Sequence, residues 1–373
     1  MIQHPIRVLL VDDSPMALAV LRRILESSPD IEVVGTAPNG REALKLVLRL
    51  RPAVICTDLH MPVMDGWQFT QEVMDIYPCP ILVISSTDLS NRAGRAYRAV
   101  EAGALDVFPK PSGMLGPGYA RTKEELVGKI RVLAGVRVFR RPKAKGTEAM
   151  EDGADTDPPV AVRPPTQWPA GTPASGDPGS LKLPGRPRVI AIGASTGGPP
   201  ALRDLLCQLP AEFDVPVLCV QHISEGFLAG LVNWLDVQCA IQVKIAHPGE
   251  VPLPGTAYFP MENTHLEVGK SEKLLLSRTA PVDGHRPSAT VLLSSVARYY
   301  GSAAIGVLLT GMGKDGGQGM LELFQCGGTT IAQDEQSCAV FGMPKAAIDL
   351  GAARYVMPPT RIGQILAGLE GST

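Results

Sequence analysis

The feature that most constrains the fold is a regular alternation of two sequence patterns between residues 7 and 133. Apolar, β-branched runs typical of buried strands alternate five times with segments whose apolar residues recur at helical spacing. The strand-like runs are RVLLVDD, IEVVGTA, AVICTDL, PILVIS and ALDVFPKP. Five strands and five helices in βα order predict a doubly wound parallel sheet, in an α/β domain over residues 5–125.

A second series of the same kind begins at Arg188. Its strand-like runs include RVIAIGAS, VPVLCVQH, AIGVLLT, TTIAQDE and YVMPP. Three short runs, TAYFP, HLEVG and KLLLSR, predict a hairpin-like region, followed by a helix from Pro287 to Tyr300. The sequence therefore predicts a second α/β domain over residues 188–370, with a mostly parallel sheet and a small antiparallel insertion.

Residues 135–187, between the two series, are rich in proline and glycine. Such a stretch buries too little apolar surface to offset the entropy of ordering the chain, so it predicts a flexible or polyproline-like linker. The basic block from Arg137 to Lys145 and the isolated Trp168 are either docking features or ordinary solvated linker residues.

Composition excludes several classes of protein. The chain has 373 residues, 45% of them apolar, and a formal net charge of −2, which gives no electrostatic reason to expect nucleic acid as a partner. No apolar stretch approaches the ~20 residues of a membrane span, and acids interrupt the N-terminal apolar run. The seven cysteines are scattered without a C-x-x-C pair, which predicts neither a disulfide framework nor a zinc site. We expect a cytoplasmic protein without membrane insertion.

Acidic and phosphate-binding residue types end four strands of the first series. Asp12 and Asp13 end the first strand, Asp58 the third, Ser85 the fourth and Lys110 the fifth. The carboxyl ends of parallel strands share one edge of the sheet, where ligands of such folds bind. Clustered carboxylates repel one another unless a hard cation such as Mg²⁺ intervenes. An aspartate there can accept a phosphoryl group covalently, while the lysine and the hydroxyl bind its oxygens.

These residues, with the motif DLHMPVMDG at 58–66, resemble the receiver domains of response regulators. The resemblance implies that Asp58 is the phosphorylation site, that Ser85 is the switch hydroxyl and that Lys110 is the family's invariant lysine, with a cis bond to Pro111. It also implies an Mg²⁺ site made by three carboxylates and one backbone carbonyl: Asp12, Asp13, Asp58 and the carbonyl of His60. One departure is Val107, which stands where receivers often carry a switch aromatic; Phe108 follows one position late.

The motif IGASTGGPP at 192–200 places Ser195 between glycines, after a strand-like run and before a helical one. A phosphate cradle is a poor explanation, because GASTGG matches neither G-x-G-x-x-G nor a P-loop, and the next strand ends in Gln221-His222 rather than in an acid. Residues 193–197 do match G-x-S-x-G, in the strand–turn–helix context of a nucleophile elbow. The pattern predicts that Ser195 is a nucleophile.

A serine nucleophile needs a base, and the base needs an orienting group. His222 ends the neighbouring strand, and Asp315 follows the strand AIGVLLT in the glycine-rich loop TGMGKDGGQGM. Both are expected at the sheet edge that carries Ser195, while His285 in GHRPS is a second candidate for the base. The backbone amides of Thr196 and Met312 are candidates for an oxyanion hole.

These motifs, with AQDEQSCAVFGMPKAAID at 332–349, resemble the chemotaxis protein-glutamate methylesterase family of the CheB type. The resemblance implies a serine hydrolase with Ser195 as nucleophile, His222 as general base and acid, and Asp315 as orienting carboxylate, without a cofactor in the catalytic domain. It implies that the enzyme demethylates glutamate γ-methyl esters on chemoreceptor helices and deamidates certain receptor glutamines. It further implies activation through phosphoryl transfer from a CheA-type histidine kinase.

Two rival functions come from other classes. A response regulator with an output domain that binds DNA or a nucleotide is the first, but a DNA-binding output is normally small, helical and basic, whereas this one is large, α/β and glycine-rich. A degenerate, inactive scaffold is the second. The intact set of Ser195, His222 and Asp315 argues against it.

Overall fold

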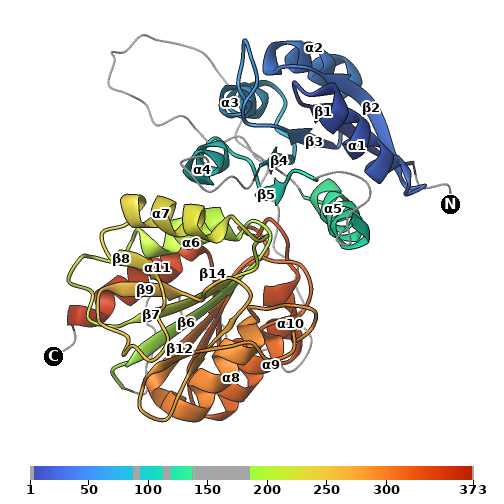
Figure 1. The fold of residues 1–373 in the computed structure, drawn as a ribbon. Helices are drawn as coiled ribbons and strands as arrows, with labels where there is room; N and C mark the ends of the chain where they lie inside the picture. The colour runs from blue at the N-terminus through green and yellow to red at the C-terminus, as the bar shows by residue number, and fades with distance from the viewer. Residues whose placement is uncertain (1–3, 87–92, 112–118, 137, 139–184, 372–373) are drawn as a thin grey trace, which may run out of the picture.

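The computed structural model describes residues 4–86, 93–111, 119–136, 138 and 185–371. It contains two parallel sheets, each covered by helices on both faces (Figure 1). Most of the predicted linker, including Trp168 and nearly all of the basic block, lies outside the described residues. Among the helices that are described, none combines the length and the apolarity needed to cross a bilayer.

The N-terminal sheet has five parallel strands in the order β2-β1-β3-β4-β5, which is the predicted doubly wound topology. Its strands are β1 (Ile6–Val11), β2 (Ile31–Ala37), β3 (Val54–Thr57), β4 (Ile81–Ser85) and β5 (Asp106–Pro109). Its helices are α1 (Pro15–Glu26), α2 (Gly40–Leu50), α3 (Gly66–Ile76), α4 (Ala93–Glu101) and α5 (Tyr119–Ala134). Side chains of α1 and α5 pack on one face, and those of α2, α3 and α4 on the other.

Local sequence explains where these helices begin. Ser14, Asn39 and Asp65 precede α1, α2 and α3, and each side chain accepts a hydrogen bond from a backbone amide of the first turn. Such caps satisfy amides that have no partner within the helix. They start α1 and α2 within a few residues of the preceding strand, whereas a longer loop separates β3 from the capped start of α3.

The C-terminal sheet has seven parallel strands in the order β14-β13-β12-β6-β7-β9-β8. These are β6 (Val189–Ala194), β7 (Val217–Gln221), β8 (Gln242–Ile245), β9 (Thr256–Phe259), β12 (Ala304–Leu308), β13 (Thr329–Gln333) and β14 (Tyr355–Met357). A separate antiparallel pair is formed by β10 (His265–Val268) and β11 (Leu274–Ser277). The predicted fold class, a mostly parallel sheet with a small antiparallel insertion, is confirmed.

Helices cover both faces of this sheet. One face carries α6 (Gly198–Leu206), α7 (Leu228–Gln238) and α11 (Pro359–Ala367), and the other carries α8 (Ala289–Tyr300), α9 (Gly317–Gln325) and α10 (Met343–Asp349). Two short 3₁₀ helices, Gly301–Ala303 and Gly368–Gly371, complete the described elements. The core is therefore two apolar layers with the sheet between them.

Two local predictions were wrong. The run TAYFP was assigned to the hairpin-like region, but it forms β9, a parallel strand of the main sheet between β7 and β8. A short apolar run carries no signal for its partner, and β8 itself was not predicted. The helix expected from Pro287 begins at Ala289, because Ser288 caps it by accepting a hydrogen bond from the amide of Val291.

The two domains contact each other through α4 of the N-terminal domain and α7 of the C-terminal domain (Figure 1). The ring of Tyr97 stacks on that of Trp234 with 5.5 Å between centroids, and the hydroxyl of Tyr97 donates to the carbonyl of Phe227 at 3.3 Å. The carboxylate of Glu101 accepts hydrogen bonds from Trp234 Nε1 at 2.7 Å and from Gln238 Nε2 at 2.9 Å. Apolar packing is continuous across this contact.

Candidate functional site

Ser195 lies where the strand order of the C-terminal sheet reverses. It follows β6, whose neighbours are β7 on one side and β12 on the other. In open parallel sheets such a reversal leaves a crevice at the carboxyl ends of the strands, where ligands bind. The topology therefore places the predicted nucleophile at the position where this fold is expected to hold a substrate.

Backbone hydrogen bonds fix Ser195 on both sides. Its amide donates to the carbonyl of Thr310 at 3.0 Å, and its carbonyl accepts from Gln221 Nε2 at 2.7 Å. Gly197 adopts a positive φ of 75° at the start of α6, a conformation that glycine adopts without steric cost. A Cβ on Gly311 would lie 2.7 Å from the Cβ of Ser195, so the two loops approach as closely as glycine allows.

His222 is brought beside Ser195 by the pairing of β6 with β7. Ala194 is in register with Gln221, and the amide of His222 donates to the carbonyl of Ala194 at 2.9 Å. The ring is nearly buried, with 9% of the side chain exposed. Its Nε2 lies 2.8 Å from Oδ2 of Asp315, whereas its Nδ1 is buried and, among the described residues, has no hydrogen-bond partner.

Asp315 is buried at the N-terminus of α8. Besides the ring of His222, its carboxylate accepts hydrogen bonds from the Ser288 hydroxyl at 2.7 Å and from the amides of Ala289, Thr290 and Gly316 at 2.7–3.0 Å. Burial opposes the charge, but the hydrogen bond and charge of His222, with the bonds from Thr290 and Ser288, hold the pKa of Asp315 well below its usual range. The carboxylate is therefore a fixed anion at a helix N-terminus.

His285, the second candidate for the base, stacks on His222. The two ring centroids are 3.9 Å apart and the rings are nearly parallel, at 5°. Burial, followed by the charge of His222, lowers the pKa of His285 to about 4. His285 is therefore neutral near pH 7 and covers one face of the His222 ring. Within the described part of the chain, its ring makes no hydrogen bond or ion pair to a carboxylate that would orient it as a base.

Two backbone amides face no partner within the described part of the chain. Thr196 lies in the turn after Ser195, and Met312 lies in the loop after β12, with half of its side chain exposed. Neither amide donates a hydrogen bond to another described residue, whereas the neighbouring amides of Ser195 and Gly311 do. These are the two amides predicted for the oxyanion hole, and both remain available to a ligand.

The residues that hold this site in place were not predicted from the sequence. Ser288 and the first amides of α8 bind Asp315, and Gln221 binds the carbonyls of both Ser195 and His222. A capping signal for Ser288 is present in RPSAT, ahead of the helical segment. No comparable pattern identifies Gln221, because its role depends on the turn that lies next to it in space.

A second cluster occupies the carboxyl edge of the N-terminal sheet. Carboxylate oxygens of Asp12, Asp13 and Asp58 all lie within 4.8 Å of one another. Nζ of Lys110 lies 2.7 Å from Asp12 Oδ2 and 2.8 Å from Asp58 Oδ2. Ser85 is buried beside them, and its carbonyl accepts from the amide of Lys110 at 2.7 Å. The structure thus brings together the side chains of the three aspartates and Lys110, with the backbone of Ser85 bonded to that of Lys110.

The donor set of this cluster fits a hard divalent cation. It consists of carboxylate oxygens, and Oδ2 of Asp12 is buried without a hydrogen bond although Lys110 lies near it. Burial raises the pKa of Asp12 in spite of that lysine, which reflects the cost of a buried anion that is only partly compensated. The acidic cluster is therefore compatible with Mg²⁺.

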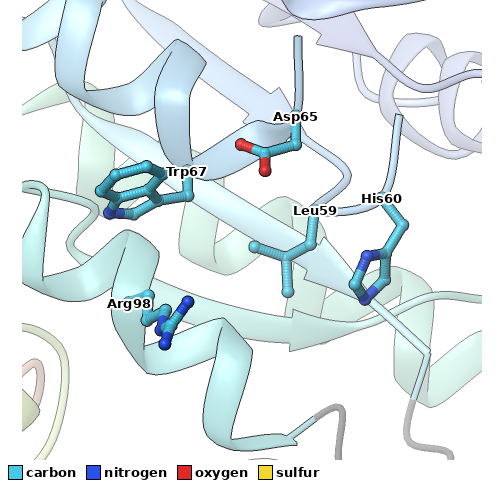
Figure 2. A pocket seen from close by; sticks show the side chains of 5 residues that line it. All are labelled: Leu59, His60, Asp65, Trp67 and Arg98. Carbon is cyan, nitrogen blue, oxygen red and sulfur yellow. The ribbon is translucent and has the colours of Figure 1, made fainter. Parts of the chain in front are cut away.

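His60, whose carbonyl was predicted as a metal ligand, follows Asp58 by two residues in the loop after β3. Its side chain lines a small pocket of about 120 Å³ with Leu59, Asp65, Trp67 and Arg98 (Figure 2). The pocket lies between the start of α3 and α4. The Lys110–Pro111 bond, for which a cis form was expected, is trans, the ordinary form of such bonds; the cis peptide among the described residues precedes Pro287.

The position of the usual switch aromatic is occupied by buried Val107. Val107 belongs to the apolar layer that contains Tyr97 of α4, whereas Phe108 points to the opposite face, toward α5. Tyr97 is one of the buried aromatics of this layer, and it is the one that stacks on Trp234 of the other domain.

Both domains match known protein families. Residues 8–115 match the family model described as response regulator receiver domain, and residues 190–366 match that described as CheB methylesterase. A protein-glutamate methylesterase/protein-glutamine glutaminase of Syntrophus aciditrophicus is 41% identical over 98% of this chain and 99% of its own length. One of Myxococcus xanthus is 40% identical over 99% and 98%.

Solved structures resemble the two halves separately. The CheB methylesterase catalytic domain of Thermotoga maritima is 38% identical, covering 49% of this chain and 98% of its own, with a TM-score of 0.48. The response regulator domain of CheB from the same organism is 35% identical, covering 36% of this chain and 99% of its own, with a TM-score of 0.33.

Proposed function

The chain belongs to the CheB methylesterase family with an N-terminal receiver domain, and we propose that Ser195, His222 and Asp315 carry its hydrolytic reaction. The protein is a protein-glutamate methylesterase and a response regulator. The observation that carries the assignment of residues is the chain of contacts at the sheet edge. Ser195 follows β6, and the amide of His222 donates a hydrogen bond to the carbonyl of Ala194, the residue before Ser195. The His222 ring is in turn hydrogen-bonded to buried Asp315.

In the proposed mechanism the base nitrogen of His222 is Nδ1. Asp315 is anionic and accepts from Nε2, so the neutral ring carries its proton on Nε2 and its lone pair on Nδ1. Nδ1 is buried without a partner among the described residues, which leaves it free to accept the proton of a serine hydroxyl. Ser195 Oγ then attacks the ester carbonyl, and the fixed charge of Asp315 stabilises the imidazolium that forms.

The amides of Thr196 and Met312 would hold the carbonyl oxygen as it becomes an oxyanion. Preorganised donors of this kind supply a large part of the rate enhancement of acyl transfer. Collapse of the intermediate breaks the bond to methoxide, which leaves as methanol with the proton from Nδ1. Water then attacks the glutamyl-serine ester with His222 again as base, which restores Ser195 and yields glutamate.

The same steps applied to a side-chain amide release ammonia and convert glutamine to glutamate. Both reactions pass through one glutamyl-serine ester, so a single site serves both. The relatives carry both activities in their names. We therefore propose chemoreceptors as substrates, through glutamate methyl esters and specific glutamines of their cytoplasmic helices, and the cytoplasm as the location of the reaction.

For the receiver we propose phosphorylation at Asp58 by a histidine kinase of the chemotaxis type. Asp12, Asp13 and Asp58, with the carbonyl of His60, would hold Mg²⁺. When bound, the cation supplies the positive charge that lets a phosphoryl group approach three carboxylates. Lys110 contacts Asp58, and its amide is bonded to the carbonyl of Ser85, which supports the proposal that both side chains bind oxygens of the phosphoryl group.

Phosphorylation would act through the α4–α7 contact. The helix α7 follows the loop that begins at His222, so a receiver seated on α7 stands beside the candidate active site. Lys129 of α5 is near enough that its charge contributes, after burial and His222, to the lowered pKa of His285. A receptor helix bundle is bulky, and a receiver in this position would obstruct it until the phosphoryl group weakens the contact.

Replacement of the nucleophile tests the hydrolytic site. Ser195→Ala should lower methanol release from methylated receptor membranes by several orders of magnitude, since the loss of a triad member elsewhere costs ~10⁴–10⁶ in turnover. Ser302→Ala is the matched control, because Ser302 is exposed and precedes β12, at the opposite edge of the sheet. Near-normal release by a folded Ser195→Ala protein would reject the assignment.

A further inference from the structure

The ends of helices α6 and α7 bring two cysteines together that lie 32 positions apart in the sequence. Cys207 is the C-cap residue that directly follows α6, and Cys239 is the C-cap residue that directly follows α7. Their sulfur atoms are 3.1 Å apart. Because the sequence spacing is long, no local pattern such as C-x-x-C announces this pair.

The two thiols differ from the three buried cysteines in exposure, and Cys207 differs from them in the direction of its pKa shift. Cys207 and Cys239 are both partly exposed, whereas Cys56, Cys79 and Cys219 are buried. The hydrogen bond from Cys239, together with the charge of nearby Arg203, lowers the pKa of Cys207, while the same hydrogen bond and burial raise the pKa of Cys239. Burial raises the pKa of Cys56, Cys79 and Cys338 to about 12.

We propose that Cys207 and Cys239 are a modification site, at which a small disulfide such as oxidised glutathione drives formation of a reversible intramolecular disulfide. The sulfur–sulfur distance must shorten by about 1 Å to reach the ~2.0 Å of a disulfide, a change within reach of side-chain rotation at two helix ends. Partly exposed disulfides of this kind are reducible and suit a regulatory role.

The reaction balances as two thiol–disulfide exchanges. The thiolate of Cys207 attacks one sulfur of oxidised glutathione and expels one glutathione thiolate, which leaves a mixed disulfide on Cys207. The sulfur of Cys239 then attacks the Cys207 sulfur and expels the second glutathione. The two cysteine protons end on the two glutathione thiols, the protein loses two electrons, and the oxidised glutathione gains them.

The site adjoins the contact between the two domains. Gln238 immediately precedes Cys239, its carbonyl accepts from the Cys207 thiol at 3.4 Å, and its side chain donates to Glu101 of α4. The disulfide would covalently link the two helices of the catalytic domain that α4 contacts. Oxidation would therefore alter the surface on which the receiver rests, at a distance from Ser195.

The test uses the full-length protein in glutathione buffers of increasing oxidised fraction, followed by acid quenching, alkylation and mass mapping of non-reduced peptides. We expect a linked pair of peptides containing Cys207 and Cys239, lighter by two hydrogens than the separate thiol peptides and lost on reduction. Exposed Cys326 should carry only glutathione, and Cys326→Ser, the matched control, should form the linked pair as the wild type does.

Single variants test the order of attack. Cys239→Ser should accumulate glutathione on Cys207, whereas Cys207→Ser should leave Cys239 as a free thiol. Methyl release by both reduced variants at the wild-type rate shows that they are folded, and this readout does not depend on which residues perform hydrolysis. If wild-type Cys207 and Cys239 remain free at a glutathione ratio that modifies Cys326, or if Cys207 retains glutathione beside a free Cys239, the proposal is wrong.

Discussion

Loosening the α4–α7 contact should activate the unphosphorylated enzyme. Glu101→Ala removes the acceptor of two hydrogen bonds, from Trp234 Nε1 and Gln238 Nε2. A hydrogen bond to a charged group contributes about 1.5–3 kcal/mol when buried, but Glu101 is half-buried and Gln238 is exposed. We therefore assign about 1.5–2 kcal/mol to the two bonds together. Removing them should raise the fraction of molecules in which the receiver no longer rests on α7, here called the open state. The basal rate should rise with that fraction, by roughly ten- to thirtyfold.

The increase has a ceiling that the same assay measures. If the open state is populated at roughly 1%, full release raises the rate by at most about a hundredfold. A fragment beginning near residue 183, which lacks the receiver, defines that limit. The measurement is methyl release from receptor membranes by wild type, Glu101→Ala and the fragment, with and without a small-molecule phosphodonor and Mg²⁺.

Glu26→Ala is the matched control for this experiment. Glu26 is also a receiver glutamate at the end of a helix, but it is exposed on α1, which lies away from the catalytic domain (Figure 1). It should leave the basal rate unchanged. If the fragment is faster than the wild type but Glu101→Ala releases methyl groups at the wild-type rate, the two hydrogen bonds of Glu101 do not stabilise the closed state. A fragment no faster than the unphosphorylated full-length enzyme would refute occlusion altogether.

Three further predictions concern single side chains. Asp315→Ala should retain at least about tenfold more methyl release than His222→Ala, since the aspartate orients and stabilises the ring but does not transfer the proton. Equal losses in the two variants would contradict this division of roles. Full activity in His222→Ala would assign the base to His285. Because the folded pKa of His285 is about 4 against an unfolded 6.5, its contribution to stability is present above pH 6.5 and is lost as the pH falls toward 4, by at most about 3 kcal/mol. Urea unfolding between pH 4 and 7 should therefore show a flatter pH dependence for His285→Gln than for wild type, and parallel curves would contradict this. Asp58→Ala should fix the full-length enzyme at its low rate with or without phosphodonor; activation of this variant would exclude Asp58 as the phosphorylation site.

The sequence was sufficient for the fold because hydrophobic periodicity is local. Each strand–helix unit is visible within about 20 residues, and the order of units predicts parallel sheets. The predicted edge residues were also found together, since parallel strands bring their carboxyl ends to one edge. This is why Asp12, Asp58 and Lys110 meet in the receiver, and why His222 lies beside Ser195 and bonds Asp315.

What the sequence could not predict depends on contacts between distant segments. The run TAYFP fits either a hairpin or a parallel strand. Its assignment as β9 depends on its pairing with β7, which is distant in the sequence. The pair of Cys207 and Cys239 depends on two helices ending side by side. Likewise, Tyr97 and Trp234 each fit the apolar face of a predicted helix. No local sequence pattern indicates that they stack on one another between the two domains.

The departure at Val107 and the Tyr97–Trp234 stack together suggest how the two sites communicate. A receiver whose β5 lacks the usual aromatic cannot signal through the rotation of that ring. Here a buried aromatic of the same apolar layer, Tyr97, belongs to α4, and its hydroxyl donates a hydrogen bond to the carbonyl of Phe227, the residue that precedes α7. Phosphorylation at Asp58 would draw Ser85 toward the phosphoryl group, and β4, which Ser85 ends, is in contact with α4. Tyr97→Phe keeps the ring stack but removes one hydrogen bond, so it should raise the basal rate only about fivefold, less than Glu101→Ala. A basal rate for Tyr97→Phe equal to that of the isolated fragment would instead make this hydroxyl the dominant link between the domains.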